Sequence, residues 1–303
     1  MASQQRTKDR RRAISRRNSR NAFLFLLPNL IGFLVFTFVP VVMAFVLAFT
    51  EWNGRGPFKF VGLKNFVNMW SDSNFTISLK NTLIYTIGTV PIIMIFAMLL
   101  SVIVFQLGKG STLIRAMHFF PNISSIVAIT VVWQFLYNKS LGPINQFLMS
   151  VGVENPPGWL SDKNWALPAV MIMIIWKSVG YYMVTYYAAL IGIPDDLYEA
   201  ASIDGATTFQ QFWHITLPQL RPVNFYVLIV AIIASFTVFT PIYVMTQGGP
   251  GRATSVLVYY IYETAFVNYK HGYSSAMSII LFLLIFIFTL FQFRMQRLDS
   301  KEG

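Results

Sequence analysis

Residues 199–218 read EAASIDGATTFQQFWHITLP, and this polar stretch lies between two long apolar runs, residues 164–191 and 222–245. The connecting segment, residues 192–221, holds four acidic side chains but, among Lys and Arg, only Arg221. Such a segment cannot be buried in hydrocarbon, because its polar groups would lose their hydrogen bonds to water. The stretch therefore indicates a contact with something outside the membrane.

The composition places the chain among membrane proteins. Of its 303 residues, 55% are hydrophobic and only 12% are charged, which is too apolar for a water-soluble globule. A net charge of +11 would suit nucleic acid, but Lys and Arg gather outside the apolar runs and no groove-reading motif accompanies them. Cysteine is absent, which excludes disulfides and Cys-ligated metals. We expect a membrane protein with no nucleic-acid partner.

Six apolar runs are long enough to cross about 30 Å of hydrocarbon as helices. They predict an all-α membrane protein with a transmembrane domain over residues 21–295, preceded by a basic tail, residues 1–20, and followed by a short tail, residues 296–303. The first run is too long for a cleaved signal peptide. The six predicted spans are residues 22–49, 78–105, 115–137, 164–191, 222–245 and 273–293.

The distribution of Lys and Arg predicts the orientation. Six spans put both termini on one side, and the segments on that side carry fourteen Lys and Arg residues against seven on the other. The positive-inside rule then places both termini and residues 192–221 in the cytoplasm. We expect a multi-pass protein of the plasma or inner membrane.

Patterns for catalysis, nucleotide binding and metal binding are missing from the sequence. Lys109 lies in a Gly-Lys-Gly turn without the first glycine or the Ser/Thr of a phosphate-binding loop. His118, His214 and His271 are far apart and have no paired acid at ligand spacing. The spans hold no Asp or Glu for a coupling proton, whereas sodium coupling through carbonyl groups stays open. We expect no catalytic residue, cofactor or metal on this chain and an energy source elsewhere.

The polar segment is predicted to fold as two short helices. Asp196 with Glu199 forms an acidic variant of a capping box, and Gly205 supplies a left-handed stop. Thr208 with Gln211 repeats the capping pattern for a second helix with an apolar stripe. The stripe consists of Phe209, Phe212 and Trp213. The alternative is an interfacial amphipathic hairpin whose acids are only solvated.

Three short motifs follow one another in this segment: Glu-Ala-Ala begins at residue 199, Asp-Gly-Ala at residue 204 and Ile-Thr-Leu-Pro at residue 215. Their order resembles the EAA loop of binding-protein-dependent ABC importer permeases. The spacing fits, with three residues between Ala201 and Gly205 and nine between Gly205 and Ile215. The resemblance implies a type I importer permease whose cytoplasmic coupling helix seats in a cleft of a separate ATPase subunit. There Glu199 would meet a basic group, and Gly205 would be the pivot between the two helices. The implied coupling residues are Glu199, Ala200, Ala201, Asp204 and Gly205.

Softer motifs resemble the carbohydrate-uptake branch, which includes maltose, lactose, multiple-sugar and glycerol-3-phosphate permeases. They are Leu27-Pro28, Pro40, residues 61–66, Asn81-Thr82, residues 241–243 and residues 246–250. One departure from the enteric maltose subunit is that no long extra domain interrupts the first external loop. The resemblance implies import of a sugar or oligosaccharide. The implied partners are a second permease subunit, two ATPase subunits that hold ATP and Mg, an extracellular solute-binding protein and membrane lipid.

Polar side chains in the fourth and fifth spans are candidates for the substrate pathway, which the resemblance puts there. A charge at the middle of a span, such as Lys177, costs about 2.5–3.5 kcal/mol, so it should face protein or water. The candidates are Lys177, Tyr181, Tyr182, Ser235, Val238, Thr240 and Tyr243. The competing explanations are a carbonyl or subunit partner for Lys177 and helix packing for the small residues. Three alternatives stay open: an anionic sugar derivative or polyol phosphate as substrate, an ion-coupled secondary transporter and, more remotely, an embedded enzyme.

Overall fold

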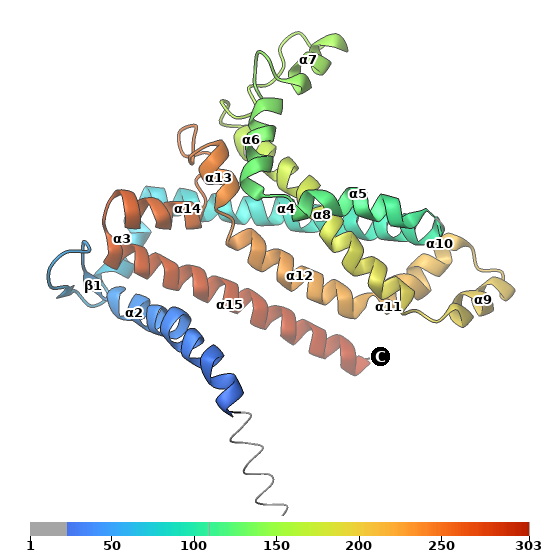
Figure 1. Cartoon of the computed structure of the whole chain (residues 1–303), viewed down its shortest axis with the longest axis horizontal. Helices are drawn as coiled ribbons and strands as arrows, with labels where there is room; N and C mark the ends of the chain where they lie inside the picture. Colours follow the sequence, from blue (N-terminus) through green and yellow to red (C-terminus); the bar gives the residue numbers. More distant parts are fainter. Residues whose placement is uncertain (1–22, 109, 303) are drawn as a thin grey trace, which may run out of the picture.

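The computed structural model describes residues 23–108 and 110–302, with side chains as far as residue 296. The basic tail predicted at residues 1–20 and the turn residue Lys109 lie outside this part. Helices build the molecule (Figure 1), and the all-α fold expected from the apolar runs is confirmed.

Five described helices are long and apolar enough to cross a membrane, and one bent helix pair makes a sixth if it crosses as a single span. They follow the apolar runs because a helix satisfies its backbone N–H and C=O groups within one segment, as hydrocarbon requires. Three of the five are single helices: α4 (Ser73–Gln106), α8 (Ala166–Ile191) and α15 (His271–Glu302), which counts as far as Gln296. The first span, Phe23–Leu47, contains η1 (Leu34–Phe38) and α2 (Val39–Leu47). The span Arg221–Met245 contains α12 (Arg221–Phe236) and α13 (Thr240–Met245).

The bent pair takes the place of the single helix that we expected over residues 115–137. It consists of α5 (Ser111–Ile123) and α6 (Ile126–Leu136), which meet at 97°. Pro121 removes one backbone donor near the end of α5, and Ser124 has an extended backbone with φ −67° and ψ 147°. These two residues explain why the run over residues 115–137 does not form one straight helix.

The fifth apolar run is also interrupted, between α12 and α13. Thr237 ends α12, and its hydroxyl donates a hydrogen bond to Ile233 O at 2.8 Å. Pro241 follows in the first turn of α13 and has no N–H to continue the helical ladder. The break leaves the short α13 free to pack against α6.

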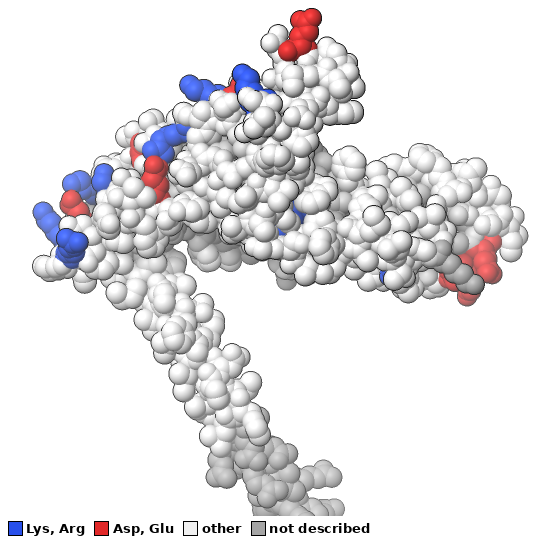
Figure 2. Space-filling view, turned by 45° about the horizontal axis from the view of Figure 1, so that its top comes forward, with Lys and Arg blue, Asp and Glu red and all other residues white. Residues whose placement is uncertain are grey.

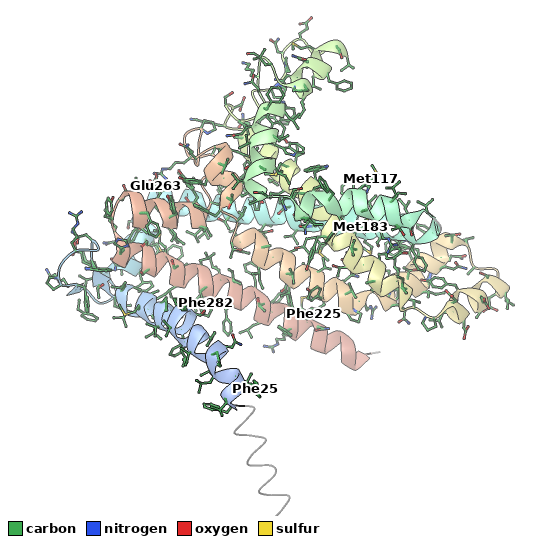
Figure 3. The ribbon with its side chains drawn as sticks, in the orientation of Figure 1. Phe25, Met117, Met183, Phe225, Glu263 and Phe282 are labelled. Carbon is green, nitrogen blue, oxygen red and sulfur yellow. The ribbon has the colours of Figure 1, made fainter. Side chains whose placement is uncertain are left out.

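The largest buried core joins α4, α8 and α12, with α5 lying along α8. Met183, labelled in Figure 3, is fully buried in it. Gly180 allows the close approach of α8 to α5, since a Cβ at this position would lie 1.8 Å from His118 O. The largest buried core of the described chain thus lies in this helix layer.

The first span stands apart from that layer. None of its apolar window is buried, and Phe25 near its start is 86% exposed and points away from the other helices (Figure 3). Its last part, α2, packs against α15, where the rings of Phe45 and Phe282 meet edge to face at 6.3 Å. The helix is therefore attached to the body of the chain at one end only.

Short elements lie at the two ends of the spans (Figure 1). One end carries β1 (Thr50–Glu51), β2 (Lys59–Phe60), α3 (Lys64–Ser71), α14 (Leu257–Tyr262) and η3 (Glu263–Val267), with α7 (Pro143–Ser150) beyond α6. The opposite end carries α9 (Asp195–Ile203), α10 (Thr208–Gln211), η2 (Phe212–Thr216) and α11 (Leu217–Gln219). We name the first the loop end and the second the α9 end.

Candidate functional site

The polar stretch of residues 199–218 folds at the α9 end as two short helices joined at Gly205. The backbone of Gly205 has φ +79°, and Ala206 N donates to Ala201 O at 2.9 Å, which closes the end of α9. A Cβ added to Gly205 would meet nothing within 4 Å. Glycine is therefore needed here for its backbone conformation and not for space.

The caps of both helices differ from the sequence-based prediction. The first begins at Asp195 with Pro194 before it, and no side chain caps it, so the Asp196–Glu199 capping box is wrong. Asp195 and Asp196 instead place acidic groups in the first turn, where the helix dipole favours them. The second capping box exists one residue earlier than predicted, between Thr207 and Gln210.

The two helices are held against each other by side-chain hydrogen bonds. The hydroxyls of Tyr198 and Thr216 lie 2.9 Å apart, and Gln211 Nε2 donates to Ser202 Oγ at 2.9 Å. Most predicted coupling residues are exposed on this hairpin, and only Ala201 is half-buried. The surface in Figure 2 shows acidic side chains gathered at this end of the molecule. The hairpin thus presents an acidic face to the outside.

Lys177 lies on α8 opposite the bend between α5 and α6. Its Nζ donates to Asn122 O at 3.2 Å, near the end of α5 where carbonyl groups lack helical partners. This carbonyl contact is the alternative that the sequence left open. An ammonium group has three donors, so two remain for other partners.

The other candidate pathway residues divide into two groups. Tyr182, Ser235 and Val238 are buried in helix packing, and Ser235 Oγ bonds to Ala231 O at 2.8 Å and lies 3.4 Å from Thr89 Oγ1. Tyr181 and Thr240 are half-buried. Tyr243 is 43% exposed and stacks on Phe239, with ring centroids 5.3 Å apart. None of the seven candidates lines either of the two described cavities, whose volumes are about 760 and 830 Å³.

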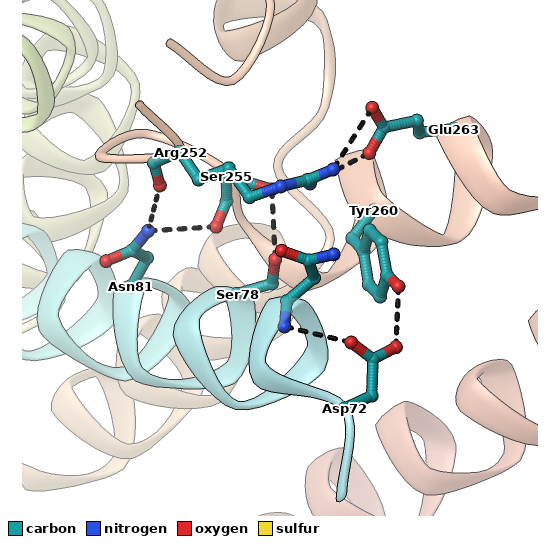
Figure 4. A network of polar contacts seen from close by, with 8 residues as sticks. Asp72, Ser78, Asn81, Arg252, Ser255, Tyr260 and Glu263 are labelled. Carbon is teal, nitrogen blue, oxygen red and sulfur yellow. Dashed lines mark hydrogen bonds and ion pairs between the residues drawn. The ribbon is translucent and has the colours of Figure 1, made fainter. Parts of the chain in front are cut away.

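A polar network at the loop end was not predicted as a unit. Figure 4 shows how residues 252–255 are joined to α4. Asn81 Nδ2 donates to Arg252 O at 2.9 Å and to Ser255 O at 3.0 Å, and the hydroxyls of Ser78 and Ser255 lie 2.9 Å apart. Arg252 also forms an ion pair with Glu263 at 2.9 Å. The loop between α13 and α14 is thereby fixed to a spanning helix.

Asp72 is a second centre of this network. It caps α4 through Asn74 N at 2.9 Å, and its other oxygen accepts hydrogen bonds from Tyr260 Oη at 2.6 Å and Tyr273 Oη at 2.9 Å. Burial acts to raise the pKa of Asp72, but these hydrogen bonds outweigh it and lower the pKa below 3.8. Burial and the bond to Asp72 raise the pKa of Tyr260 to about 12. The sequence signal that could have predicted this helix cap is an acidic residue just before a long apolar run.

A polar cavity of about 760 Å³ opens beside this network, between α3, the β1–β2 hairpin and the start of α15. Its walls carry the cations Arg55, Lys64 and Lys270 and the acids Glu51 and Asp72. Figure 2 shows Lys and Arg side chains gathered at this end of the molecule. This cavity is therefore mixed in charge, with more cations than acids on its walls.

Comparison with known proteins gives the chain its family. Residues 78–298 match the family described as binding-protein-dependent transport system inner membrane component. The probable ABC transporter permease protein YurN of Bacillus subtilis is 34% identical over 92% of this chain and 97% of its own. UgpA of Agrobacterium fabrum, an sn-glycerol-3-phosphate transport system permease protein, is 35% identical (90% and 93%). LacF of Rhizobium radiobacter, a lactose transport system permease protein, is 33% identical (90% and 93%).

Solved structures share the fold as well. A chain of a bacterial alginate ABC transporter, in complex with an alginate pentasaccharide-bound periplasmic protein, superposes with a TM-score of 0.83 at 25% identity, covering 94% of this chain and 96% of that chain. The match spans nearly all of both chains, and the family match contains α9 and Gly205. The chain belongs to the family of binding-protein-dependent transport system inner membrane components, and it is an ABC transporter permease.

Proposed function

We propose that the chain is one of two membrane subunits of an importer that carries a sugar or oligosaccharide into the cell, driven by ATP hydrolysis on separate subunits. The observation that carries this proposal is the exposed acidic hairpin of α9 and α10, whose EAA order is that of a coupling loop. LacF and the alginate transporter are named for carbohydrates, which supports the substrate class.

The α9 end is the proposed contact with the ATPase subunits and faces the cytoplasm together with both chain termini. Glu199 and Asp204 are exposed there and offer charge to a basic group, and Ala200 and Ala201 are small enough for close docking. Gly205 is the proposed pivot because it alone joins the two helices in a left-handed conformation. ATP and Mg would be held by the partner, so this chain would need no nucleotide site of its own.

The loop end is the proposed contact with an extracellular solute-binding protein. In the alginate transporter a periplasmic protein is bound, and here the loop at residues 252–255 is fixed by the network around Asn81. A fixed loop can transmit a push from a docked protein to α4, whereas a mobile one would absorb it. The cations at the polar cavity would attract acidic groups of the binding protein.

A second permease subunit is proposed to cover apolar surface that this chain leaves open. The outer side of α5 carries a stripe of exposed side chains at helical spacing, Leu113, Met117 and Phe120, each about two-thirds exposed. The first span has no buried residue at all in its apolar window. The substrate pathway would run between the two subunits, with Lys177 and Tyr181 of α8 beside it. Three of the other candidates would support the pathway wall from within the helix packing: Tyr182, Ser235 and Val238. Two candidates would contribute to the pathway from α13, Thr240 and Tyr243.

An anionic substrate is a second candidate, because Lys177 has two donors beyond its bond to Asn122 O. UgpA is named for sn-glycerol-3-phosphate, and the transporter of known structure imports the acidic polysaccharide alginate. The two substrate classes can be distinguished in one uptake assay in which unlabelled neutral sugars and unlabelled sugar acids compete with the labelled substrate. The class that inhibits uptake is the class that the importer carries.

Reconstitution of the purified complex in liposomes tests the proposal. Uptake should require the ATPase subunits, ATP and the binding protein, and Glu199→Ala should abolish uptake and ATPase stimulation without loss of substrate binding by the binding protein. Glu154→Ala, an exposed acid between α7 and α8 at the other end, is the matched control. Uptake by this chain without any ATPase would show that it is a secondary transporter.

A further inference from the structure

A cavity of about 830 Å³ lies between the last turns of α4 and the hairpin formed by α9, α10 and η2. Val102 and Ile103 of α4 form one wall, and Phe209 and Trp213 form the other. A volume of this size lies within the range of small-molecule binding sites in proteins. The cavity is distinct from the pathway candidates, none of which lines it.

The depth of the cavity indicates where its occupant comes from. Ile103 lies in the last turn of the apolar run of α4 and is 53% exposed, so the α4 wall offers apolar surface at the edge of the hydrocarbon that α4 would cross. Trp213 is 50% exposed on the facing wall, and tryptophan is enriched where hydrocarbon meets the headgroups. An occupant with an apolar part at the α4 wall and a polar part beyond Trp213 matches this geometry.

The charges at the cavity are acidic. Asp195 and Glu199 line it on the α9 side, and none of the described Lys or Arg residues is among its walls. The nearby cation Arg115 lies over the ring of Tyr187 at 4.2 Å and bonds to Ser111 O, so it is directed elsewhere. The polar part of the occupant should therefore carry a positive group.

We propose that this cavity binds a phospholipid with an amine headgroup, such as phosphatidylethanolamine, from the leaflet on the α9 side. One acyl chain would fill the space between Ile103 and Trp213, and the ammonium group would meet Asp195. Lipid tails are as apolar as the walls, so burial of the chain does not select one lipid over another. Selection comes from the headgroup, and the carboxylate of Asp195 disfavours an anionic lipid, whereas Glu199 is the group proposed to contact the ATPase. The proposal requires only that α4 spans the membrane, and it is independent of the transported substrate.

Quenching of tryptophan fluorescence by brominated acyl chains tests the site. The complete importer is placed in nanodiscs of phosphatidylglycerol that contain a small fraction of either brominated phosphatidylethanolamine or brominated phosphatidylglycerol. The amine lipid should quench more efficiently by about two- to fivefold, the range expected for one exposed ion pair. Trp213→Phe should remove this difference, because it removes the reporter in the cavity.

Two further variants separate the cavity from the general lipid surface. Asp195→Asn should bring the two lipids to equal quenching, and Ile103→Phe should reduce the difference by narrowing the space beside the α4 wall. Ile95→Phe is the matched control, since Ile95 lies on the same helix, is also 53% exposed and is not part of the cavity wall; it should keep the preference. Equal quenching by both lipids in the unmodified protein, or an unchanged preference in Asp195→Asn, would overturn the proposal.

Discussion

Substitution of Gly180 by Ala tests the close contact between α8 and α5. A Cβ at this position would lie 1.8 Å from His118 O and 2.4 Å from His118 C, both backbone atoms of α5. A carbon–oxygen contact needs about 3.3 Å, so α8 and α5 must move apart. Backbone atoms within a helix cannot rotate away as a side chain can. We expect destabilisation of about 1–3 kcal/mol, the usual cost of overpacking.

The same movement should reach Lys177, which lies one turn before Gly180 on α8. Its bond to Asn122 O is already 3.2 Å long, and a shift of α5 by even a few tenths of an ångström would break it. Gly180→Ala should therefore lower the melting temperature by about 2–4 °C for each kcal/mol lost. It should also reduce transport, since it releases the bend between α5 and α6.

The assay is thermal unfolding of the purified complex in detergent, with two matched controls. Gly88→Ala would place its Cβ 2.0 Å from Met171 Cε, but this atom ends a flexible side chain that can turn aside. Gly32→Ala would meet nothing within 4 Å and should be neutral or slightly stabilising. A Gly180→Ala protein that melts at the wild-type temperature would refute the close-packing argument, and so would equal losses in all three variants.

Three other predictions concern the hairpin, the loop end and the pathway. Gly205→Ala should cost about 1–2 kcal/mol through backbone strain and impair transport, whereas Gly205→Asn, which tolerates positive φ better, should be milder in the same uptake assay. Asp72→Asn should lower stability at neutral pH by about 1–2 kcal/mol. The pKa of Asp72 is lowered in the folded chain, so the contribution of its carboxylate to stability is present above pH 3.8 and is lost as the pH falls through the folded pKa. Below the folded pKa the melting temperatures of the wild-type protein and the Asp72→Asn variant should converge. Lys177→Met should change the KM of uptake while the complex still purifies intact; loss of the complex would mean that its bond to Asn122 serves assembly.

The spanning helices could be predicted because each is encoded by one continuous apolar run. The fourth run was expected over residues 164–191, and the helix covers Ala166–Ile191. The second helix begins five residues earlier than expected because Asp72 caps it in the polar region before the apolar run. The bend between α5 and α6 was not predicted, although Pro121 is followed by Asn122, Ser124 and Ser125, because the length of the whole run suited one spanning helix.

The sites were harder to predict because their partners are distant in sequence. Lys177 meets a carbonyl 55 positions away, and Asn81 meets one 171 positions away. Ser235 and Val238 were candidates for the pathway, but both are buried in helix packing. The sequence does not separate the two roles, because a face of small or polar residues has the same pattern in a pore and in a packed interface. The motif around Glu199 was readable because its residues are consecutive.

The first span, which lies against the rest of the chain only near α15, has a consequence for biogenesis. This helix satisfies its own backbone hydrogen bonds and buries no residue of its apolar window against the body. It can therefore enter the bilayer and remain stable there while the later spans are still being synthesised. The core of α4, α8 and α12 must wait for residues as far as Ala231. Membrane insertion and tertiary folding of this chain are thus separate events, and the N-terminal helix is free during the interval between them.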